Sequence, residues 1–291
     1  MNNPLQDEQT YAIIDLALAE DSVHGDVTSE ALIPPTLLGK AFLQAKAEGV
    51  LAGIHVAGKV LLRVDPSLEF SVLVEDGRRI RPGDRLATIS GSVTSILGAE
   101  RVTLNFLQRL SGIASLAAEY VSRAEGLKAT IVDTRKTAPG LRMLEKYAVR
   151  VGGARNHRLH LGDGILIKDN HLVALRALDM DLKSIVAKAR VSAPPDLQVE
   201  VEVTTVEEAL EAADAGADII MLDNMGLDDM RRAVSLLPEG VKTEASGGVN
   251  LDNVRAVAET GVDIISVGAL THSPEALDIS LEIEPESLKL A

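Results

Sequence analysis

Ala215-Gly-Ala-Asp-Ile-Ile220 and Thr260-Gly-Val-Asp-Ile-Ile265 are two copies of one short pattern, 45 residues apart. In each copy a helix-like run ends at a glycine, and an apolar run typical of a buried strand follows directly. Such a junction joins a helix to the next strand of a sheet. Its recurrence predicts β-α units repeated around a parallel sheet, which is an α/β fold.

Outward from this repeat, strand-like and helix-like runs alternate from residue 129 onward. Each intervening segment is long enough to hold a helix. This alternation favours a barrel of six or seven strands over an open doubly wound sheet, and such barrels bind ligands at the carboxyl ends of their strands. The expected strands are 129–132, 165–168, 197–203, 218–222, 241–244 and 263–267.

The chain before about Gly112 has the mixed pattern of an α+β domain. We therefore expect an N-terminal domain over residues 1–112 and a barrel over 113–273. Residues 274–291 are expected to pack back on the first domain through a strand near 279–283. In the N-terminal part, helices are expected over 7–20, 53–64 and 97–123, and strands within 39–50 and 69–89, with turns at Asp76-Gly77 and Pro82-Gly-Asp84.

The 291-residue chain is 46% hydrophobic but only 2% aromatic, so its core must be built from Ala, Val, Ile and Leu. It contains no Cys, which excludes disulfides, thiol nucleophiles and Cys-ligated metals. No apolar run reaches the roughly 18 residues of a membrane span, and the acidic N-terminal stretch is unlike a signal peptide. We expect a cytoplasmic protein with no membrane partner.

The net charge of −14 disfavours non-specific binding to nucleic acid. The charge is uneven, because residues 134–176 hold nine Lys or Arg against three acids. That segment is therefore +6 and the remainder is −20. A basic segment in an acidic chain predicts a small anionic ligand. The competing interpretation is a solvated basic helix face.

Two glycine loops follow neighbouring expected strands and predict a phosphate cradle. Ser246-Gly247-Gly248 precedes Asn250, a good helix N-cap, and Gly268-Ala269-Leu270 precedes an expected helix start at Ser273-Pro-Glu275. Free backbone N–H groups at helix starts point at an anion. A glycine after a strand is also common in a plain tight turn, so the prediction depends on both loops together.

Carboxylates also follow the expected strands, on the side where barrels bind ligands. Glu200 and Glu202 lie two residues apart on one strand, so their side chains share a face. Glu202 and Asp223 are candidate ligands of Mg²⁺, directly or through water, because this ion takes a few carboxylates plus substrate oxygens. The alternative is that these carboxylates only pair with Lys168 or Arg158.

Arg135, Lys136 and Arg158 are suited to hold carboxylate groups, because a guanidinium fork matches the two oxygens of a carboxylate. His157 adds a donor, or a proton if its pKa permits, although a histidine beside an arginine is often structural. We interpret four other histidines as structural: His24, in a turn and helix cap over His24–Thr28, and His55, His160 and His272.

One set of motifs extends over nearly the whole chain. The set comprises Asp133–Arg142, Glu145–Ala148, Gly152-Gly153, Asn156–Arg158 and Leu166–His171, together with His24–Thr28, Glu100-Arg101, Asn105, Glu200–Glu202, Leu222–Asn224, Ser246–Gly248 and Val267–Ser273. It resembles the core signature of the quinolinate phosphoribosyltransferase family. The long basic block is the specific part of the match.

The resemblance implies an α+β N-terminal domain and an incomplete α/β barrel. It implies phosphoribosyl transfer from phosphoribosyl pyrophosphate to quinolinate with loss of carbon dioxide, which gives nicotinate mononucleotide and pyrophosphate in NAD biosynthesis. Mg²⁺ would be bound with phosphoribosyl pyrophosphate, near Lys168, Glu202, Asp223 and the glycine loops. Catalytic roles are implied for Lys136, Lys168, Glu202 and Asp223, and further substrate contacts for Arg101, Thr134, Arg135, His157, Arg158, Ser246, Gly247, Gly248, Gly268, Ala269 and Leu270.

The resemblance also implies a homodimer in which Arg101 of one subunit completes the barrel site of the other. It leaves open whether dimers associate into larger rings.

Three other functions stay open at this point. A paralogue linked to molybdate transport has the same fold but differs at the Asn156–Arg158 and Lys168–His171 motifs, which are intact here. A nicotinate phosphoribosyltransferase handles one carboxylate and needs fewer basic contacts. A non-catalytic phosphate-sugar sensor has no need of Glu202 and Asp223 for leaving-group chemistry.

Overall fold

The computed structural model describes residues 8–22, 25–194 and 196–290. The chain divides into two compact units, each described by itself below. The first unit comprises residues 1–118, 137–153 and 271–291, and the second comprises residues 119–136 and 154–270.

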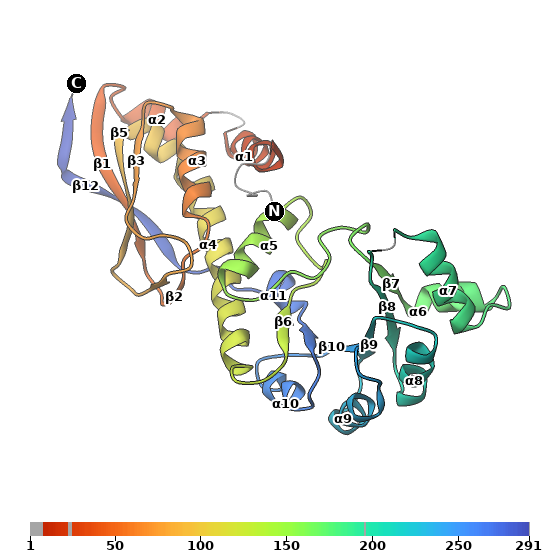
Figure 1. The fold of residues 1–291 in the computed structure, drawn as a ribbon. Coiled ribbons are helices and arrows are strands. Elements are labelled where there is room, and N and C mark those ends of the chain that lie inside the picture. The colour runs from red at the N-terminus through yellow and green to blue at the C-terminus, as the bar shows by residue number, and fades with distance from the viewer. Residues whose placement is uncertain (1–7, 23–24, 195, 291) are drawn as a thin grey trace. The chain divides into compact units, whose positions relative to one another are not determined.

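The first unit is built on a four-stranded antiparallel sheet with strand order β12-β1-β5-β3 (Figure 1). Helix α3 packs close to β3, and Gly58 permits this approach: a Cβ atom there would lie only 2.7 Å from the ring of Phe70. The elements of this unit are α1 (Glu8–Asp21), α2 (Val27–Leu32), β1 (Leu37–Ala45), β2 (Gly49–Val50), α3 (Ile54–Val64), β3 (Glu69–Val72), β4 (Arg79–Ile80), β5 (Arg85–Ser92), most of α4 (Val93–Arg123), α5 (Arg142–Val151), the end of α11 (Ala269–His272) and β12 (Ile279–Leu290).

The strand expected near 279–283 is confirmed and extends further, to Leu290. It pairs with β1 along its length, with Ile279 opposite Ala45 and Leu290 opposite Leu37. The expected strand stretches 39–50 and 69–89 each contain more than one strand. Turns containing Gly77 and Gly83, both at positive φ, separate β3, β4 and β5.

Helix α5 groups with the first unit, whereas the sequence placed residues 113–273 together in the barrel. Its Glu145 is fully buried and accepts a hydrogen bond from Arg109 Nε on α4 at 2.9 Å. The hydroxyl of Tyr147 donates to Asp76 at 2.7 Å, and Asp76 also caps the first turn of α3. Side-chain contacts therefore tie α5 to the first unit, and helical periodicity carries no signal of them.

The histidines outside the barrel mouth have local partners. His55 contacts Glu75 at 3.0 Å, and His160 contacts Asp163 at 2.9 Å. The cap expected over His24–Thr28 is present, because Asp26 accepts the backbone N–H of Ser29 at 3.0 Å. His24 itself lies outside the described residues.

The second unit is a six-stranded parallel sheet with strand order β6-β11-β10-β9-β8-β7. Within the described residues no ladder joins β7 to β6, so the barrel is incomplete, as predicted. Throughout the described chain, no helix is long and apolar enough to cross a membrane. The elements of this unit are β6 (Thr130–Val132), β7 (Ile165–Ile167), α6 (Asp169–Arg176), α7 (Leu182–Ser192), β8 (Val199–Val203), α8 (Val206–Asp214), β9 (Ile219–Asp223), α9 (Leu227–Leu236), β10 (Lys242–Ser246), α10 (Val254–Ala258) and β11 (Ile264–Ser266).

The repeated pattern makes the same junction twice. Gly216 and Gly261 follow helices α8 and α10, and both adopt left-handed φ angles, 93° and 92°. The aspartate two residues later then binds the start of a neighbouring strand. Asp218 accepts the first N–H of β8 at 2.7 Å, and Asp263 accepts a backbone N–H of β10 at 2.9 Å. The motif thus ends a helix and fixes the register of two parallel strands.

Asp263→Asn is expected to lower the free energy of unfolding at neutral pH by about 1–2 kcal/mol, because it weakens charge-assisted bonds to Lys128 and Thr243. Burial opposes ionisation of Asp263, but these two partners outweigh it and lower its pKa. The contribution is therefore present at neutral pH and is lost as the pH falls below about 4, through the lowered pKa. Urea unfolding at pH 7 and near pH 3 measures it.

The matched control is Asp228→Asn. Asp228 is 98% exposed and pairs with Arg231 on the surface of α9, so its loss should change stability by less than about 0.5 kcal/mol. Equal losses in the two variants, or a loss at Asp263 that does not shrink in acid, would contradict the role given to the repeated aspartate.

Candidate active site

The carboxyl ends of all six parallel strands border one cavity of about 620 Å³ in the second unit. The structure thus brings together most residues that the sequence predicted for a site. Those lining the cavity are Thr134, Arg135, Lys136, His157, Arg158, Lys168, Glu202, Asp223, Ser246, Gly247 and Gly248. Five further residues complete the lining: Leu166, Met221, Asn224, Glu244 and Ser266.

Four predicted site residues do not line this cavity. Arg101 is exposed on α4, in the first unit. Gly268, Ala269 and Leu270 follow β11, but the side chain of Leu270 is fully buried.

The helix starts expected after the glycine loops were wrong in position. The helix after β11 begins at Ala269 and ends at His272, because Pro274 disfavours helical backbone before it and has no N–H to donate. Helix α10 begins only at Val254, with Asn253 as its N-cap. Asn250 instead accepts the backbone N–H groups of Asp252 and Asn253 at 2.9 and 3.1 Å, and so caps a turn that precedes the helix.

The Ser246-Gly247-Gly248 loop keeps the geometry of a close-approach loop. Both glycines lie at left-handed φ angles, 85° and 61°. A Cβ atom at Gly247 would lie 2.7 Å from the side-chain nitrogen of Asn224. Larger residues therefore do not fit here, and the backbone of this loop borders the cavity directly.

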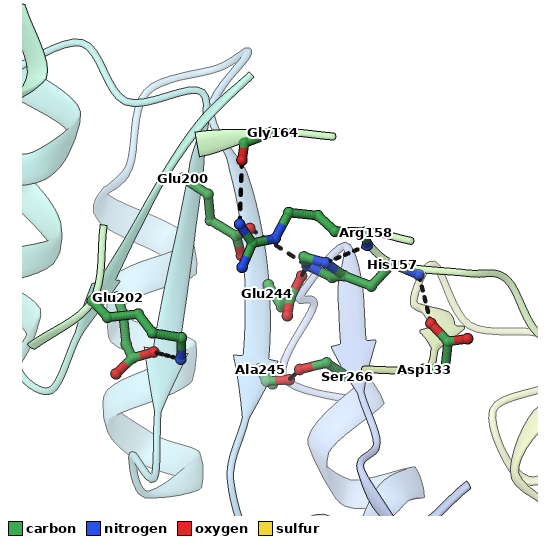
Figure 2. A network of polar contacts seen from close by, with 10 residues as sticks. Asp133, His157, Arg158, Gly164, Glu200, Glu202, Glu244, Ala245 and Ser266 are labelled. Carbon is green, nitrogen blue, oxygen red and sulfur yellow. Dashed lines mark hydrogen bonds and ion pairs between the residues drawn. The ribbon is translucent and has the colours of Figure 1, made fainter. Parts of the chain in front are cut away.

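Asp133 positions the basic residues on the opposite side of the cavity. It is fully buried at the end of β6 and accepts the backbone N–H of His157 at 2.8 Å (Figure 2). It also accepts the side-chain amide of Asn156 at 2.7 Å. These bonds hold the Asn156–Arg158 segment against the strand ends. The sequence placed Asp133 at a strand end but gave it no role.

Glu200 and Glu244 converge on the ring of His157 (Figure 2). The Nε2 atom lies 3.4 Å from Glu200 and 3.1 Å from Glu244. Burial disfavours the imidazolium, but the two carboxylates outweigh it and raise the pKa of His157 to about 10. Burial raises the pKa of Glu200, because it disfavours the charged carboxylate. The partly buried histidine and the two buried carboxylates therefore keep an extra proton at neutral pH.

The same three residues offer metal-ligand atoms within 4.8 Å of one another. However, Nδ1 of His157 accepts the backbone N–H of Arg158 at 2.8 Å, so Nε2 carries the ring proton and has no lone pair for a metal. With a neutral ring Nδ1 accepts from Arg158, and with a charged ring both nitrogens carry protons, so in either form His157 offers no lone pair to a metal. Both ring nitrogens of His157 are thus occupied by protein groups.

Two guanidinium groups are left incompletely bonded in the cavity. The Nε atoms of Arg135 and Arg158 are buried and lack a hydrogen-bond partner among the described residues. Arg158 also donates through Nη1 to the carbonyl of Gly164 at 3.2 Å. Burial lowers the pKa of Arg158, against the pull of Glu200. Buried donors of a cation without partners are costly, so this arrangement indicates an anionic ligand.

The candidate Mg²⁺ ligands lie on neighbouring strands, β8 and β9. Lys168 Nζ donates to Glu202 at 2.7 Å, which is the ion pair considered as the alternative for this carboxylate. Asp223 accepts the amide of Asn224 through Oδ2 at 2.8 Å, and its Oδ1 has no partner in the described part of the chain. Two carboxylates beside an open cavity fit a cation that takes its other oxygens from substrate and water.

Family models match both parts of the chain. Quinolinate phosphoribosyl transferase, C-terminal domain, matches residues 113–282, and the N-terminal domain of the same family matches residues 26–111. The chain belongs to the quinolinate phosphoribosyltransferase family. This confirms the resemblance drawn from the motifs.

Relatives within the quinolinate phosphoribosyltransferase family match over nine tenths or more of each chain. The probable nicotinate-nucleotide pyrophosphorylase (carboxylating) of Bacillus subtilis is 43% identical over 264 residues, which are 91% of this chain and 90% of that protein. The solved nicotinate-nucleotide pyrophosphorylase of Francisella tularensis is 38% identical with a TM-score of 0.88, over 95% of this chain and 96% of that one. NadC from Streptococcus pyogenes is 42% identical with a TM-score of 0.89, over 97% of each chain.

No role in the site was predicted from the sequence for four polar residues: Glu244, Asn224, Ser266 and Asp133. Asn224 and Asp133 directly follow strands β9 and β6, and Glu244 and Ser266 lie on strands β10 and β11. The rule that found Glu202 and Asp223 would have found Glu244, whose position on β10 lies beside β9. Asp133 could be placed by that rule, but its hydrogen bonds to a distant segment have no local signal.

Proposed function

We propose that this chain joins quinolinate to phosphoribosyl pyrophosphate and releases carbon dioxide and pyrophosphate, giving nicotinate mononucleotide for NAD biosynthesis. The observation that carries the proposal is the pair of buried guanidinium Nε atoms of Arg135 and Arg158, which have no hydrogen-bond partner among the described residues and share one cavity with the Glu202 and Asp223 carboxylates. The cationic part suits a small dicarboxylate and the carboxylate part suits a diphosphate with its cation. A cytoplasmic location is part of the proposal, and the absence of Cys fits a reducing compartment.

Quinolinate carries two adjacent carboxylates on a pyridine ring. Arg135 and Arg158 supply guanidinium forks for them, with Lys136 and Thr134 on the same side of the cavity. His157 acts by fixing the Arg158 backbone, because both of its ring nitrogens are already bonded. A ring held through both carboxylates presents its nitrogen in one orientation, which lowers the entropy lost in reaching the transition state.

Phosphoribosyl pyrophosphate would be held through its phosphates. Lys168, the N–H groups of the Ser246-Gly247-Gly248 loop, and Mg²⁺ on Glu202 and Asp223 would offset the charge of the leaving pyrophosphate. When bound, Mg²⁺ supplies Lewis acidity toward the pyrophosphate oxygens. The ion pair between Lys168 and Glu202 must then open or share its carboxylate with the cation.

The reaction needs no covalent bond to the protein. The bond from ribose C1 to pyrophosphate breaks and takes its electron pair to the leaving oxygen. The pyridine nitrogen then forms the new bond to C1, which makes the ring a cation. The bond from C2 to its carboxylate breaks, carbon dioxide leaves, and C2 takes up a proton in place of the carboxylate.

Substrate choice tests the proposal. Quinolinate should be turned over in the presence of phosphoribosyl pyrophosphate, whereas nicotinate should react at least about 1,000 times more slowly in kcat/KM. Nicotinate lacks the carboxylate that leaves, and it would leave one buried guanidinium unpaired. Product analysis by liquid chromatography separates the two reactions. Comparable turnover of nicotinate would mean a nicotinate phosphoribosyltransferase, and phosphoribosyl pyrophosphate binding without turnover would mean a sensor.

Asp223→Asn tests the proposed cation site. The change keeps the size of the side chain but removes the charge that Mg²⁺ needs, so the Mg²⁺ concentration for half-maximal rate should rise about tenfold and kcat should fall. The control is Asp229→Asn, an aspartate on α9 that does not line the cavity. A Mg²⁺ titration of the three proteins decides the point. If the curves of Asp223→Asn and wild type coincide, Asp223 has only a structural pairing.

We also propose that the enzyme is a homodimer and that Arg101 reaches the cavity of the partner subunit. The support is its exposure on α4 in the first unit, together with the substrate contact that the family resemblance implies for it. A homodimer with twofold symmetry would use such a residue twice, once in each site.

A further inference from the structure

Asn224 has a backbone conformation that is rare for a residue with a side chain. Its φ angle is 53°, and among the described non-glycine residues only Asp179, at 57°, shares this left-handed region. Asparagine and aspartate tolerate the region better than other side chains, but glycine adopts it more readily still. Strain of this kind persists where surrounding contacts fix it, and it gathers at functional sites.

Three contacts hold Asn224 at the edge of the cavity. Its backbone N–H donates to the carbonyl of Ser246 at 2.9 Å, and its side-chain nitrogen donates to Asp223 Oδ2 at 2.8 Å. The amide also fills the space above Gly247, where a Cβ atom would meet it. Asn224, which directly follows β9, thus contacts both the Asp223 carboxylate and the glycine loop after β10.

The consequence for Asp223 is a fixed orientation without a change of charge. The neutral amide occupies Oδ2 and leaves Oδ1 without a partner among the described residues, available to a cation. The consequence for the loop is a fixed spacing, because the amide and Gly247 pack directly against each other. A glycine at position 224 would relieve the backbone but would lose both effects.

We propose that Asn224 is a positioning residue for the pyrophosphate-bearing half of the cavity: it orients Asp223 and spaces the Ser246-Gly247-Gly248 loop. The inference rests on the proposed function, since it takes a diphosphate with a divalent cation as the ligand of this half. Asn224 acts through its neighbours and makes no contact with the reacting atoms.

Two substitutions separate the side chain from the backbone. Asn224→Gly keeps the φ angle accessible and removes the amide. Asn224→Asp keeps the shape but replaces the N–H donor by an oxygen that repels Asp223. We expect KM for phosphoribosyl pyrophosphate to rise about tenfold in the glycine variant and further in the aspartate variant. KM for quinolinate should stay within about twofold, because its proposed contacts lie on the other side of the cavity.

The matched control is Asp179→Gly, which relieves the same backbone conformation in an exposed turn outside the cavity. It should leave both KM values unchanged. Thermal midpoints of all variants should lie within about 4 °C of wild type, which shows that any kinetic change does not come from unfolding. Calorimetric titration with pyrophosphate in the presence of Mg²⁺ gives a second readout, independent of turnover.

The outcomes are distinct. A selective rise in KM for phosphoribosyl pyrophosphate with about tenfold weaker pyrophosphate binding supports the role given to Asn224. Unchanged values in Asn224→Gly, or equal increases for both substrates, overturn it. A wild-type protein that turns over neither substrate overturns the proposed function instead. In that event the pyrophosphate titration still decides whether Asn224 shapes the half-site, since weaker binding supports the role and equal binding refutes it.

Discussion

Arg101→Ala and Lys168→Ala should each be nearly inactive alone and should recover activity when they are mixed. If Arg101 acts in the cavity of the partner subunit, each mixed dimer holds one site with both lesions and one site with neither. Random exchange makes half of the dimers mixed, so the recovered rate should approach roughly a quarter of wild type. Rates are measured before and after subunit exchange, with native mass spectrometry to follow the mixed dimer.

A second mixture provides the control. Lys168 and Glu202 lie 2.7 Å apart in one barrel, so a mixture of Lys168→Ala and Glu202→Ala leaves a lesion in every site. It should stay inactive after full exchange. Recovery in both mixtures would indicate contamination or reassembly. No recovery in the first mixture, with mixed dimers present, would mean that Arg101 has no role in the partner's site.

Arg158→Ala should reduce kcat/KM for quinolinate about 1,000-fold while changing KM for phosphoribosyl pyrophosphate little. The buried Nε of Arg158, like that of Arg135, has no hydrogen-bond partner among the described residues, so it can donate to a substrate carboxylate. Loss of a desolvated charge pair costs about 2–5 kcal/mol in binding. Arg158→Lys keeps the charge without the fork and should fall between alanine and wild type.

Stability measurements distinguish a loss of substrate binding in Arg158→Ala from a folding defect. Arg158→Ala loses one side-chain hydrogen bond, to the Gly164 carbonyl, so the variant should melt within a few degrees of wild type. Arg176→Ala is the control within the same basic segment, because Arg176 is exposed in the last turn of α6. It should retain full activity. A similar loss of kcat/KM in Arg158→Ala and Arg176→Ala would favour the alternative interpretation, in which the basic segment is a solvated helix face.

The sequence predicted the barrel well, because each of its strands carries a local signal. All six expected strands are present within a few residues of their predicted bounds, and the repeated aspartates explain why the pattern recurs. The position of α5 could not be predicted. Its placement depends on the contacts of Glu145 and Tyr147 with residues far along the chain, and helical periodicity says only that a helix has a buried face.

The site was predictable where chemistry and strand ends coincide, and less so where a side chain is engaged by the protein itself. For His157 the sequence left open a donor to substrate or a structural residue, and in the structure its two ring nitrogens contact Glu244 and the Arg158 backbone. The second glycine loop was expected to start a helix at Ser273, but the short helix there spans Ala269–His272 and ends before Pro274. Both differences arise from contacts or backbone limits that residue type and spacing alone do not reveal.

Loss of one particular carboxylate from quinolinate tests the central claim most directly. Quinolinate labelled with ¹³C in the carboxylate on C2 should release labelled carbon dioxide, one for each nicotinate mononucleotide formed, and only when phosphoribosyl pyrophosphate and Mg²⁺ are present. Label in the carboxylate on C3 should stay in the nucleotide. Release without phosphoribosyl pyrophosphate, release from the C3 carboxylate, or a nucleotide that keeps both labels would contradict the account.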